Sequence, residues 1–274
     1  AYKGSYIEDI GSIFIDKNNP ELTVDVSLLK DDLPIDEEKE IDELILRIKK
    51  NEPSLWFNLK DFALNEVLTS IKDDLKLFNV SFDQWFYESS LGDVNDKESQ
   101  VAVAINTLKE KELAYEEKGA IWLNTSSSGD DKNRVLIRDD GRATYFASDV
   151  AYHKDKVDRG FNKLINVWGA DHHGYIKRIE ASLDGLGFDK EKLSVQLVQF
   201  ANLFKDGKKV KMSTRSGDFY SLADLIKDIG TDAARFYYLS KQADQHLDFD
   251  LDLAKSDTKE TVSYTHLTLP TRLS

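Results

Sequence analysis

Three short segments of the chain combine residue types that bind and transform small polar substrates. One is Lys211-Met-Ser-Thr-Arg215, which places two cations and two hydroxyl groups in a loop that leaves through Gly217. Such a loop can close over a triphosphate and put positive charge where negative charge builds up in phosphoryl or nucleotidyl transfer. An exposed polar loop would carry the same charges, and the clustering alone favours that interpretation.

A second segment begins at Gly169, directly after the apolar run Leu164–Trp168. If that run is a parallel strand, the loop lies where an open α/β sheet binds its ligand, in front of a helix N-terminus that favours phosphate, ribose or carboxylate. Asp171 can accept hydrogen bonds from ribose hydroxyls, and His172 or His173 can donate to phosphate or carboxylate. A solvated turn with a capping aspartate is the alternative interpretation.

A third segment carries Tyr145 and Asp149, four residues apart at an expected strand-to-helix junction. At this spacing the two side chains can line one face of a pocket. Asp149 can pair with a guanidinium through two parallel hydrogen bonds, and Tyr145 can cover that cation by packing or through its hydroxyl. If the pair stands alone, a helix cap beside an aromatic core residue is the favoured explanation.

A metal site is the rival interpretation of Asp171-His-His173. The run resembles the signature of a phosphoesterase family that hydrolyses phosphodiesters with divalent metals. That family also needs paired aspartates at the ends of other strands. The available candidates are Asp139, Asp140 and Asp149. No Asp-x-Asp follows an earlier apolar strand, so this interpretation ranks second.

Apolar spacing predicts the elements that position these segments. A helical period covers residues 36–50 and again 64–78, so the first 80 residues are expected to be mainly helical. Further helices are expected around 101–108 and 176–186, and after caps at Ser221 and Thr231.

Strands are expected where β-favouring residues lie between turn signals. Such runs cover residues 80–87, 164–168 and 193–200, with a hairpin of 119–123 and 134–138 and a turn at Asp206-Gly207. Strands that alternate with helices predict an α/β fold with a parallel sheet. If only half of such a sheet is present, its apolar strand edges would be exposed, and we expect poor solubility or association.

Composition narrows the function classes. The chain is 41% hydrophobic and 11% aromatic, which suffices for a real core, and its apolar runs are too short for a membrane helix. It has no cysteine, which excludes disulfides and thiolate metal sites and fits a reducing cytoplasm. A net charge of −13 argues against a stand-alone nucleic-acid binder, and the acidic run over 31–43 is expected to be solvated surface.

Both ends of the sequence carry their own expectations. The chain opens at Ala1 and its single methionine is Met212, so we expect the natural N-terminus to be absent. Patterned sequence stops near Ser256, and the tail 257–274 is typical of translated vector or adaptor sequence.

Taken in order, the motifs within 140–153, 167–174 and 211–215 resemble the catalytic core of bacterial arginyl-tRNA synthetases. Residues 249–254 are similar to the segment that joins that core to the anticodon-binding helical domain. The resemblance covers nearly all of residues 1–256. It implies the second half of a class I Rossmann-like parallel sheet over 80–256, preceded by a mainly helical insertion region over 1–79.

Members of that family join arginine to ATP as an adenylate, release pyrophosphate, and then transfer arginine to the terminal ribose of tRNA(Arg). The resemblance implies that L-arginine, ATP and tRNA(Arg) are the partners, with Mg²⁺ accompanying ATP, in a monomeric cytoplasmic enzyme. The residues that it assigns fall into three groups. Arginine would be bound by Tyr145, Asp149 and His173; ATP by Gly169, Asp171, His172, Lys211 and Met212; and catalysis would rest on Lys211, Ser213 and Arg215.

Departures from the family pattern limit these expectations. A His-x-Gly-His-type motif, which the family carries in the first half of its fold, occurs nowhere in the sequence, and Arg215 stands where the common class I loop ends in lysine. The anticodon-binding domain is absent too, so the chain alone is expected to be inactive. A metal phosphodiesterase and a non-catalytic synthetase paralogue remain the alternative functions.

Overall fold

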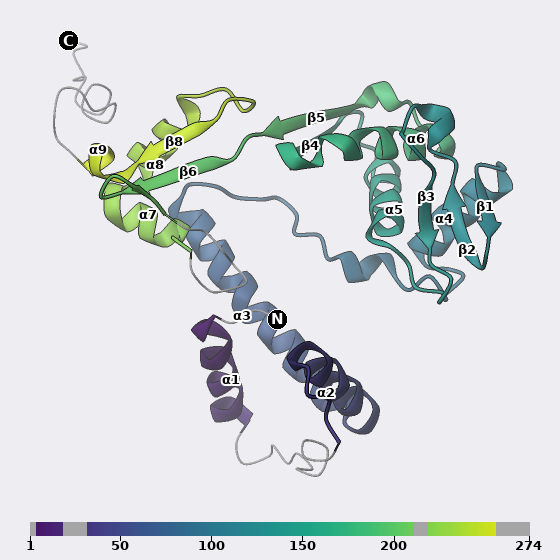
Figure 1. Cartoon of the computed structure of the whole chain (residues 1–274), viewed down its shortest axis with the longest axis horizontal. Coiled ribbons are helices and arrows are strands. Elements are labelled where there is room, and N and C mark those ends of the chain that lie inside the picture. Colours follow the sequence, from purple (N-terminus) through teal and green to yellow (C-terminus); the bar gives the residue numbers. More distant parts are fainter. Residues whose placement is uncertain (1–3, 19–31, 211–218, 256–274) are drawn as a thin grey trace. The chain divides into compact units, whose positions relative to one another are not determined.

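A computed structural model describes residues 4–18, 32–210 and 219–255 of the chain (Figure 1). Contacts divide the chain into two compact units. The first contains residues 1–81, 202–240 and 248–274, and the second contains residues 82–201 and 241–247. Each unit therefore draws on stretches that are far apart in sequence.

The N-terminal part of the first unit is helical, as expected. It consists of α1 (Ser5–Asn18), α2 (Glu37–Asn51) and α3 (Pro53–Leu77). Asp36 caps α2 by accepting a 3.1 Å hydrogen bond from the Lys39 amide. α3 begins earlier than its apolar period predicts, because proline in the first helical turn loses no hydrogen bond. α1 packs on α3 with the rings of Phe14 and Phe62 5.3 Å apart.

The C-terminal part of the first unit adds a small sheet and three helices. Its strands have the order β7-β6-β8. The elements are β6 (Ala201–Lys205), β7 (Lys208–Lys209), α7 (Leu222–Ile229), α8 (Thr231–Leu239), β8 (Leu247–Asp250) and α9 (Leu251–Lys255). β6 and β7 form an antiparallel hairpin around the expected turn, where Asp206 and Gly207 both have positive φ.

The predicted caps of α7 and α8 have different outcomes. Ser221 caps α7 in a reciprocal capping box with Asp224, which confirms the first. The prediction for Thr231 is wrong: Gly230 occupies the cap position of α8, and Thr231 is the first helical residue. The Thr231 hydroxyl is used elsewhere, because it donates a 2.8 Å hydrogen bond to the Leu77 carbonyl at the end of α3.

Main-chain acceptors at the end of α3 join the two parts of the first unit. Besides the bond from Thr231, Arg235 donates to the carbonyl of Phe78 at 2.8 Å and lies over the Phe78 ring. The expected regions, 1–79 and 80–256, divide the chain differently from these contacts, which group residues 202–240 with the N-terminal helices. A functional division into an insertion region and a catalytic region stays a prediction.

The second unit begins with η2 (Glu88–Leu91) and continues through a meander, an α/β pair and their helices. Its further elements are α4 (Gln100–Glu110), β1 (Ala114–Glu117), β2 (Ala120–Leu123), η3 (Ser126–Ser128), β3 (Arg134–Ile137), α5 (Tyr145–Asp158), β4 (Leu164–Gly169), η4 (Ala170–Tyr175), α6 (Ile176–Leu186), η5 (Lys190–Lys192) and β5 (Leu193–Val198).

Two sheets of different kinds occur in this unit. β1, β2 and β3 form an antiparallel meander that includes the predicted hairpin. β4 and β5 run parallel, paired from Leu164 and Leu193 to Gly169 and Val198, and α6 lies on the connection between them. This strand-helix-strand crossover confirms the predicted α/β fold with a parallel sheet.

The strand predicted over residues 80–87 is wrong. These residues are described and form neither helix nor strand. Their aromatic side chains serve tertiary packing instead: Phe82 meets Trp85 edge to face, and Phe86 stacks on Tyr152 of α5 with 4.2 Å between ring centroids. Aromatic residues favour strands only where a partner strand is available, so their composition misled the prediction.

α4, α5 and α6 enclose the core of the second unit. Leu108 of α4, Val150 of α5 and Ile179 of α6 are all completely buried. α6 approaches α4 closely at Gly185, where an added Cβ would lie 2.9 Å from a methyl of Leu108. Packing in this core buries one side of α5, so the opposite side of that helix can carry polar groups.

One surface of β4 is apolar and exposed. Ile165 and Val167 are 59% and 67% exposed, whereas Leu164 and Asn166, which alternate with them, are buried. Alternate residues of a strand point to opposite faces, so the exposed pair lies on a single face. β4 thus has an exposed apolar face, while the exposed strand edges expected from half a parallel sheet and the association of the chain stay predictions.

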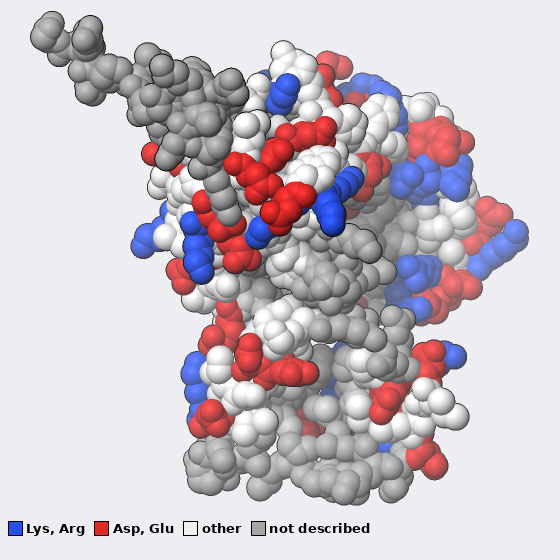
Figure 2. All heavy atoms as spheres, turned by 60° about the vertical axis from the view of Figure 1, so that its left-hand side comes forward, with Lys and Arg blue, Asp and Glu red and all other residues white. Residues whose placement is uncertain are grey.

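Charged side chains of both signs lie side by side on the face shown in Figure 2, in keeping with mixed solvated surface. Among the described residues, no helix is long and apolar enough to cross a membrane.

We predict that Leu108→Ala lowers the free energy of unfolding by about 2–5 kcal/mol, because it removes buried methyl groups and leaves a cavity between α4 and α6. Urea unfolding followed by tryptophan fluorescence measures the loss. Val103→Ala is the matched control, since Val103 lies on the same helix and is 40% exposed, and it should cost under about 0.5 kcal/mol. Equal losses from both variants would contradict the assignment of the core.

Candidate active site

The start of α5 positions the predicted Tyr145 and Asp149. The chain turns back after β3 through a bridge between Ile137 and Ala143, and the Thr144 hydroxyl donates to the Val135 carbonyl at 2.9 Å. The same oxygen accepts from the Ala147 amide at 3.3 Å and caps α5. Tyr145 and Asp149 then follow one turn apart on the first two turns of the helix.

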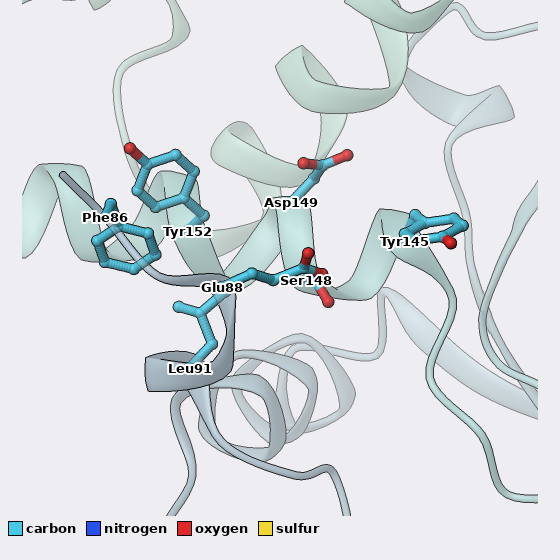
Figure 3. Close-up of a pocket in the computed structure, with 7 residues that line it drawn as sticks. All are labelled: Phe86, Glu88, Leu91, Tyr145, Ser148, Asp149 and Tyr152. Carbon is cyan, nitrogen blue, oxygen red and sulfur yellow. The ribbon is translucent and has the colours of Figure 1, made fainter. Parts of the chain in front are cut away.

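Both side chains line one pocket, as expected. The cavity has a volume of about 290 Å³ and is the one drawn in Figure 3. Its lining consists of Phe86, Glu88, Leu91, Tyr145, Ser148, Asp149 and Tyr152. In Figure 3 the rings of Phe86 and Tyr152 form one flank and Tyr145 lies toward the other, with Asp149 between them. Aromatic walls around a carboxylate suit a flat organic cation.

Glu88 brings a second carboxylate to this pocket, although no sequence pattern predicts it. It lies on η2, which packs against α5, although 61 residues separate Glu88 from Asp149 in sequence. Two carboxylates in one cavity of this size favour a ligand with positive charge spread over several donors. No spacing rule links the two residues, because η2 reaches α5 only through the tertiary fold.

The carboxylate of Asp149 is half-buried and hydrogen-bonded. Tyr175 of η4 donates its hydroxyl hydrogen to Oδ2 of Asp149 at 2.6 Å. Burial raises the pKa of Asp149, the bond from Tyr175 opposes that rise, and the neighbouring Glu88 adds to it. Lys156 and His172 favour the ionised form through their charges. A cationic ligand in the pocket would therefore further stabilise the ionised form of Asp149.

A buried polar chain ties α5 to β4 behind Asp149. Lys156 donates to the Asn166 side-chain oxygen at 3.1 Å, and the Asn166 amide donates to Nε2 of His153 at 2.8 Å. Nδ1 of His153 then donates to the main-chain carbonyl of Asp149 at 2.7 Å. Burial, followed by the charge of Lys156, lowers the pKa of His153 to about 4, so the ring is neutral near pH 7. Burial also lowers the pKa of Lys156.

The Gly169 loop lies at the carboxyl end of β4, where the sequence placed it. A Cβ at Gly169 would lie 2.5 Å from a carboxylate oxygen of Asp171, the outer end of an exposed side chain, so a larger residue there would mainly displace that side chain. The side chains of Asp171 and His172 are 58% and 60% exposed and 3.7 Å apart. His172 also meets the ring of Tyr175 edge-on at 6.5 Å. His173 is exposed and is not part of the lining described for the Asp149 pocket.

Four predicted residues lie outside the described part of the chain. They are Lys211, Met212, Ser213 and Arg215. Their assigned roles stay predictions, as do the roles given to the residues of α5 and the Gly169 loop.

The described residues give the metal interpretation no support. Within residues 4–18, 32–210 and 219–255, no three His, Asp or Glu side chains are grouped to hold a metal ion. Asp140, one of the expected carboxylate ligands, pairs with Arg142 instead, and the guanidinium beside it lowers its pKa.

Comparison with known proteins gives matches of one kind. The family model described as tRNA synthetases class I (R), catalytic domain, matches residues 39–264. The chain is 45% identical to an arginine–tRNA ligase of Nitrosospira multiformis and 44% identical to one of Thioalkalivibrio sulfidiphilus. Each match covers 96% of this chain, but only 45% and 46% of those relatives. The chain thus spans less than half the length of these curated relatives.

Solved structures agree. A Campylobacter jejuni protein described as an arginyl-tRNA synthetase matches with a TM-score of 0.73 and 35% identity, over 96% of this chain and 50% of that one. The Thermus thermophilus arginyl-tRNA synthetase matches with a TM-score of 0.61, over 93% and 53% of the two chains, and its 15% identity supports the fold alone. These matches give no support to the phosphodiesterase interpretation.

The depressed pKa of His153 predicts how stability depends on pH. In the unfolded chain this histidine takes up a proton near pH 6.5, whereas in the folded chain it does so only near pH 4. Its contribution is therefore complete above pH 6.5, falls as the pH drops toward 4, and does not fall further below that. We expect a loss on the order of 3 kcal/mol across this window.

Urea unfolding of the wild-type chain and of His153→Gln at steps between pH 4 and 7.5 measures this loss. The difference between the two should widen as pH rises, because the variant lacks the buried imidazole. His246→Gln, at an exposed histidine of the same unit, should keep the wild-type pH dependence. A pH-independent difference between wild type and His153→Gln would refute the assignment.

Proposed function

Because the chain belongs to the arginyl-tRNA synthetase family of class I, we propose that its α5 pocket binds the side chain of L-arginine for attachment to tRNA(Arg). In the whole enzyme, a carboxylate oxygen of arginine attacks the α-phosphorus of ATP, and the bond to the β-phosphate breaks to release pyrophosphate. A hydroxyl of the terminal ribose of tRNA(Arg) then attacks the arginyl carbonyl carbon, and AMP leaves as the ester bond forms.

The observation that carries this proposal is the pairing of Asp149 and Glu88 in one aromatic-walled cavity. A guanidinium is planar and offers five N–H donors, so two carboxylates can share it while aromatic faces cover its plane. Lysine offers a compact ammonium and citrulline no charge, so neither satisfies the same acceptors. A site built to receive hydrogen-bonding groups rejects ligands that leave its acceptors unpaired.

The proposed ATP site begins at the carboxyl end of β4. We assign Gly169, Asp171 and His172 to ATP, with His173 near the amino acid, and the segment from Lys211 to Arg215 to the phosphates. Adenylate formation requires mainly that the two substrates are held in line and that cations balance the charge on the departing pyrophosphate. We also assign Mg²⁺ to the ATP phosphates, because this ion is usually bound through substrate phosphates and one or two carboxylates.

The remaining parts of the proposal concern the whole protein. We place it in the cytoplasm as a monomer, and we expect this chain to be inactive by itself because the His-x-Gly-His-type motif is missing from its sequence. Arginine-dependent exchange of pyrophosphate into ATP by the whole enzyme would support the proposal. Absence of exchange by a folded whole protein would favour the non-catalytic paralogue.

Calorimetric titration of the 274-residue chain with a non-hydrolysable arginyl-adenylate analogue tests the pocket directly. We expect Asp149→Asn to weaken binding by at least about 30-fold, since a partly buried guanidinium would lose its charged acceptor. Glu88→Gln should weaken binding less, because Glu88 is more exposed.

Asp158→Asn is the matched control, because it removes an exposed carboxylate from the same helix without touching the pocket. It should bind like the wild type. Equal affinity of the wild-type chain and Asp149→Asn would refute the assignment of Asp149, and a folded wild-type chain without affinity would show that the pocket does not suffice in this chain.

A further inference from the structure

The Asp149 carboxylate depends on a partner that lies 26 residues away in sequence. Tyr175 Oη is 2.6 Å from Oδ2 of Asp149, and the tyrosine must be the donor because an ionised carboxylate only accepts. A bond of this length from a neutral hydroxyl to a charged oxygen is of the stronger, charge-assisted kind.

Neighbours on four sides hold the Tyr175 ring in place. Phe146 and Trp168 meet it edge-on with ring centroids 5.9 and 5.8 Å away, and His172 lies 6.5 Å away. The guanidinium of Arg178 lies over the ring at 5.1 Å, and its Nε is 3.7 Å from Asp130. Since these neighbours come from α5, β4, η4 and α6, the hydroxyl is fixed relative to the elements that form the site.

Building on the arginine site proposed above, we propose that Tyr175 is a positioning residue whose hydroxyl fixes the orientation in which the Asp149 carboxylate receives the guanidinium. The terminal torsion of an aspartate is broad, so one fixed oxygen sets the plane of the whole carboxylate. Each oxygen accepts more than one hydrogen bond, so Oδ2 stays available to the ligand.

The same bond affects the charge of the carboxylate. Burial and Glu88 raise the pKa of Asp149, whereas the bond from Tyr175 and the charges of Lys156 and His172 lower it. Burial and the neighbouring carboxylate raise the pKa of Tyr175 itself, against the opposing charge of Arg178, so it remains a donor throughout the physiological range. Removing the hydroxyl should therefore raise the pKa of Asp149. As the pH is lowered, the variant should then lose guanidinium binding at a higher pH than the wild type does.

Tyr175→Phe isolates the hydroxyl, because it keeps the ring and its four packing contacts. We measure the affinity of the 274-residue chain for L-arginine by calorimetry between pH 5 and 8. We also follow the titration of the Asp149 side-chain carboxyl by carbon NMR without any ligand. We expect binding weaker by about 10- to 100-fold at pH 7, the loss typical of a hydrogen bond to a charged group, and Asp149 titrating at higher pH.

Tyr115→Phe is the matched control. Its hydroxyl accepts a 2.9 Å hydrogen bond from Asn133 on the meander and lies outside the pocket, so the variant should keep both wild-type values. The proposal would be overturned if Asp149 titrates in Tyr175→Phe as it does in the wild type. This holds even if the variant binds arginine more weakly, because general damage to the fold could weaken binding.

The binding and NMR measurements also distinguish this inference from the proposed function. If Asp149 titrates at higher pH in Tyr175→Phe but wild type binds arginine no better than Asp149→Asn does, the role of Tyr175 in holding the carboxylate is supported. In that case only the assignment of arginine to the pocket is rejected.

Discussion

A negative charge held partly away from water is the constraint around which the second unit is arranged. Asp149 loses hydration by its place on α5, and burial by itself would favour the neutral acid. The hydroxyl of Tyr175 and the nearby cation of Lys156 offset part of that loss. Because these groups come from different elements, they can do so only when η4 and α5 are correctly packed. Site and fold are thus stabilised by the same contacts.

α5 serves both purposes by dividing its surface. Phe146, Ala147, Val150 and Ala151 face the core, and His153 ties the helix to β4 through Asn166. The polar chain behind Asp149 has all its described donors and acceptors paired, which matters because an unpaired group at this depth would cost about 1–3 kcal/mol. Packing and polar pairing therefore hold the helix that carries Asp149 from two sides.

Local pattern predicted most elements and two of the seven residues that line the pocket. The helices near 36–50 and 176–186, the hairpin of β2 and β3, and the strands β4 and β5 follow from period and turn chemistry, which act over a few residues. Tyr145 and Asp149 share the pocket because one helical turn separates them. Glu88 and Tyr175 were not predicted, since they reach Asp149 from other elements and no spacing encodes that meeting. Composition also failed at Phe82 and Phe86, where aromatic residues pack without a strand.

The joint at the end of α3 has a consequence for sequence variation. The side chains of Thr231 and Arg235 donate hydrogen bonds to main-chain carbonyls at this helix end. The acceptors belong to Leu77, Phe78 and Asn79, and every residue type has such a carbonyl. Leu77 is 59% exposed, so its own side chain adds little to the joint. Related proteins are then free to change the residue at 77 while keeping the joint, whereas a change at 231 or 235 removes a donor. We therefore expect position 77 to vary more among related proteins than positions 231 and 235, whereas position 78 is restricted by the packing of its ring under Arg235.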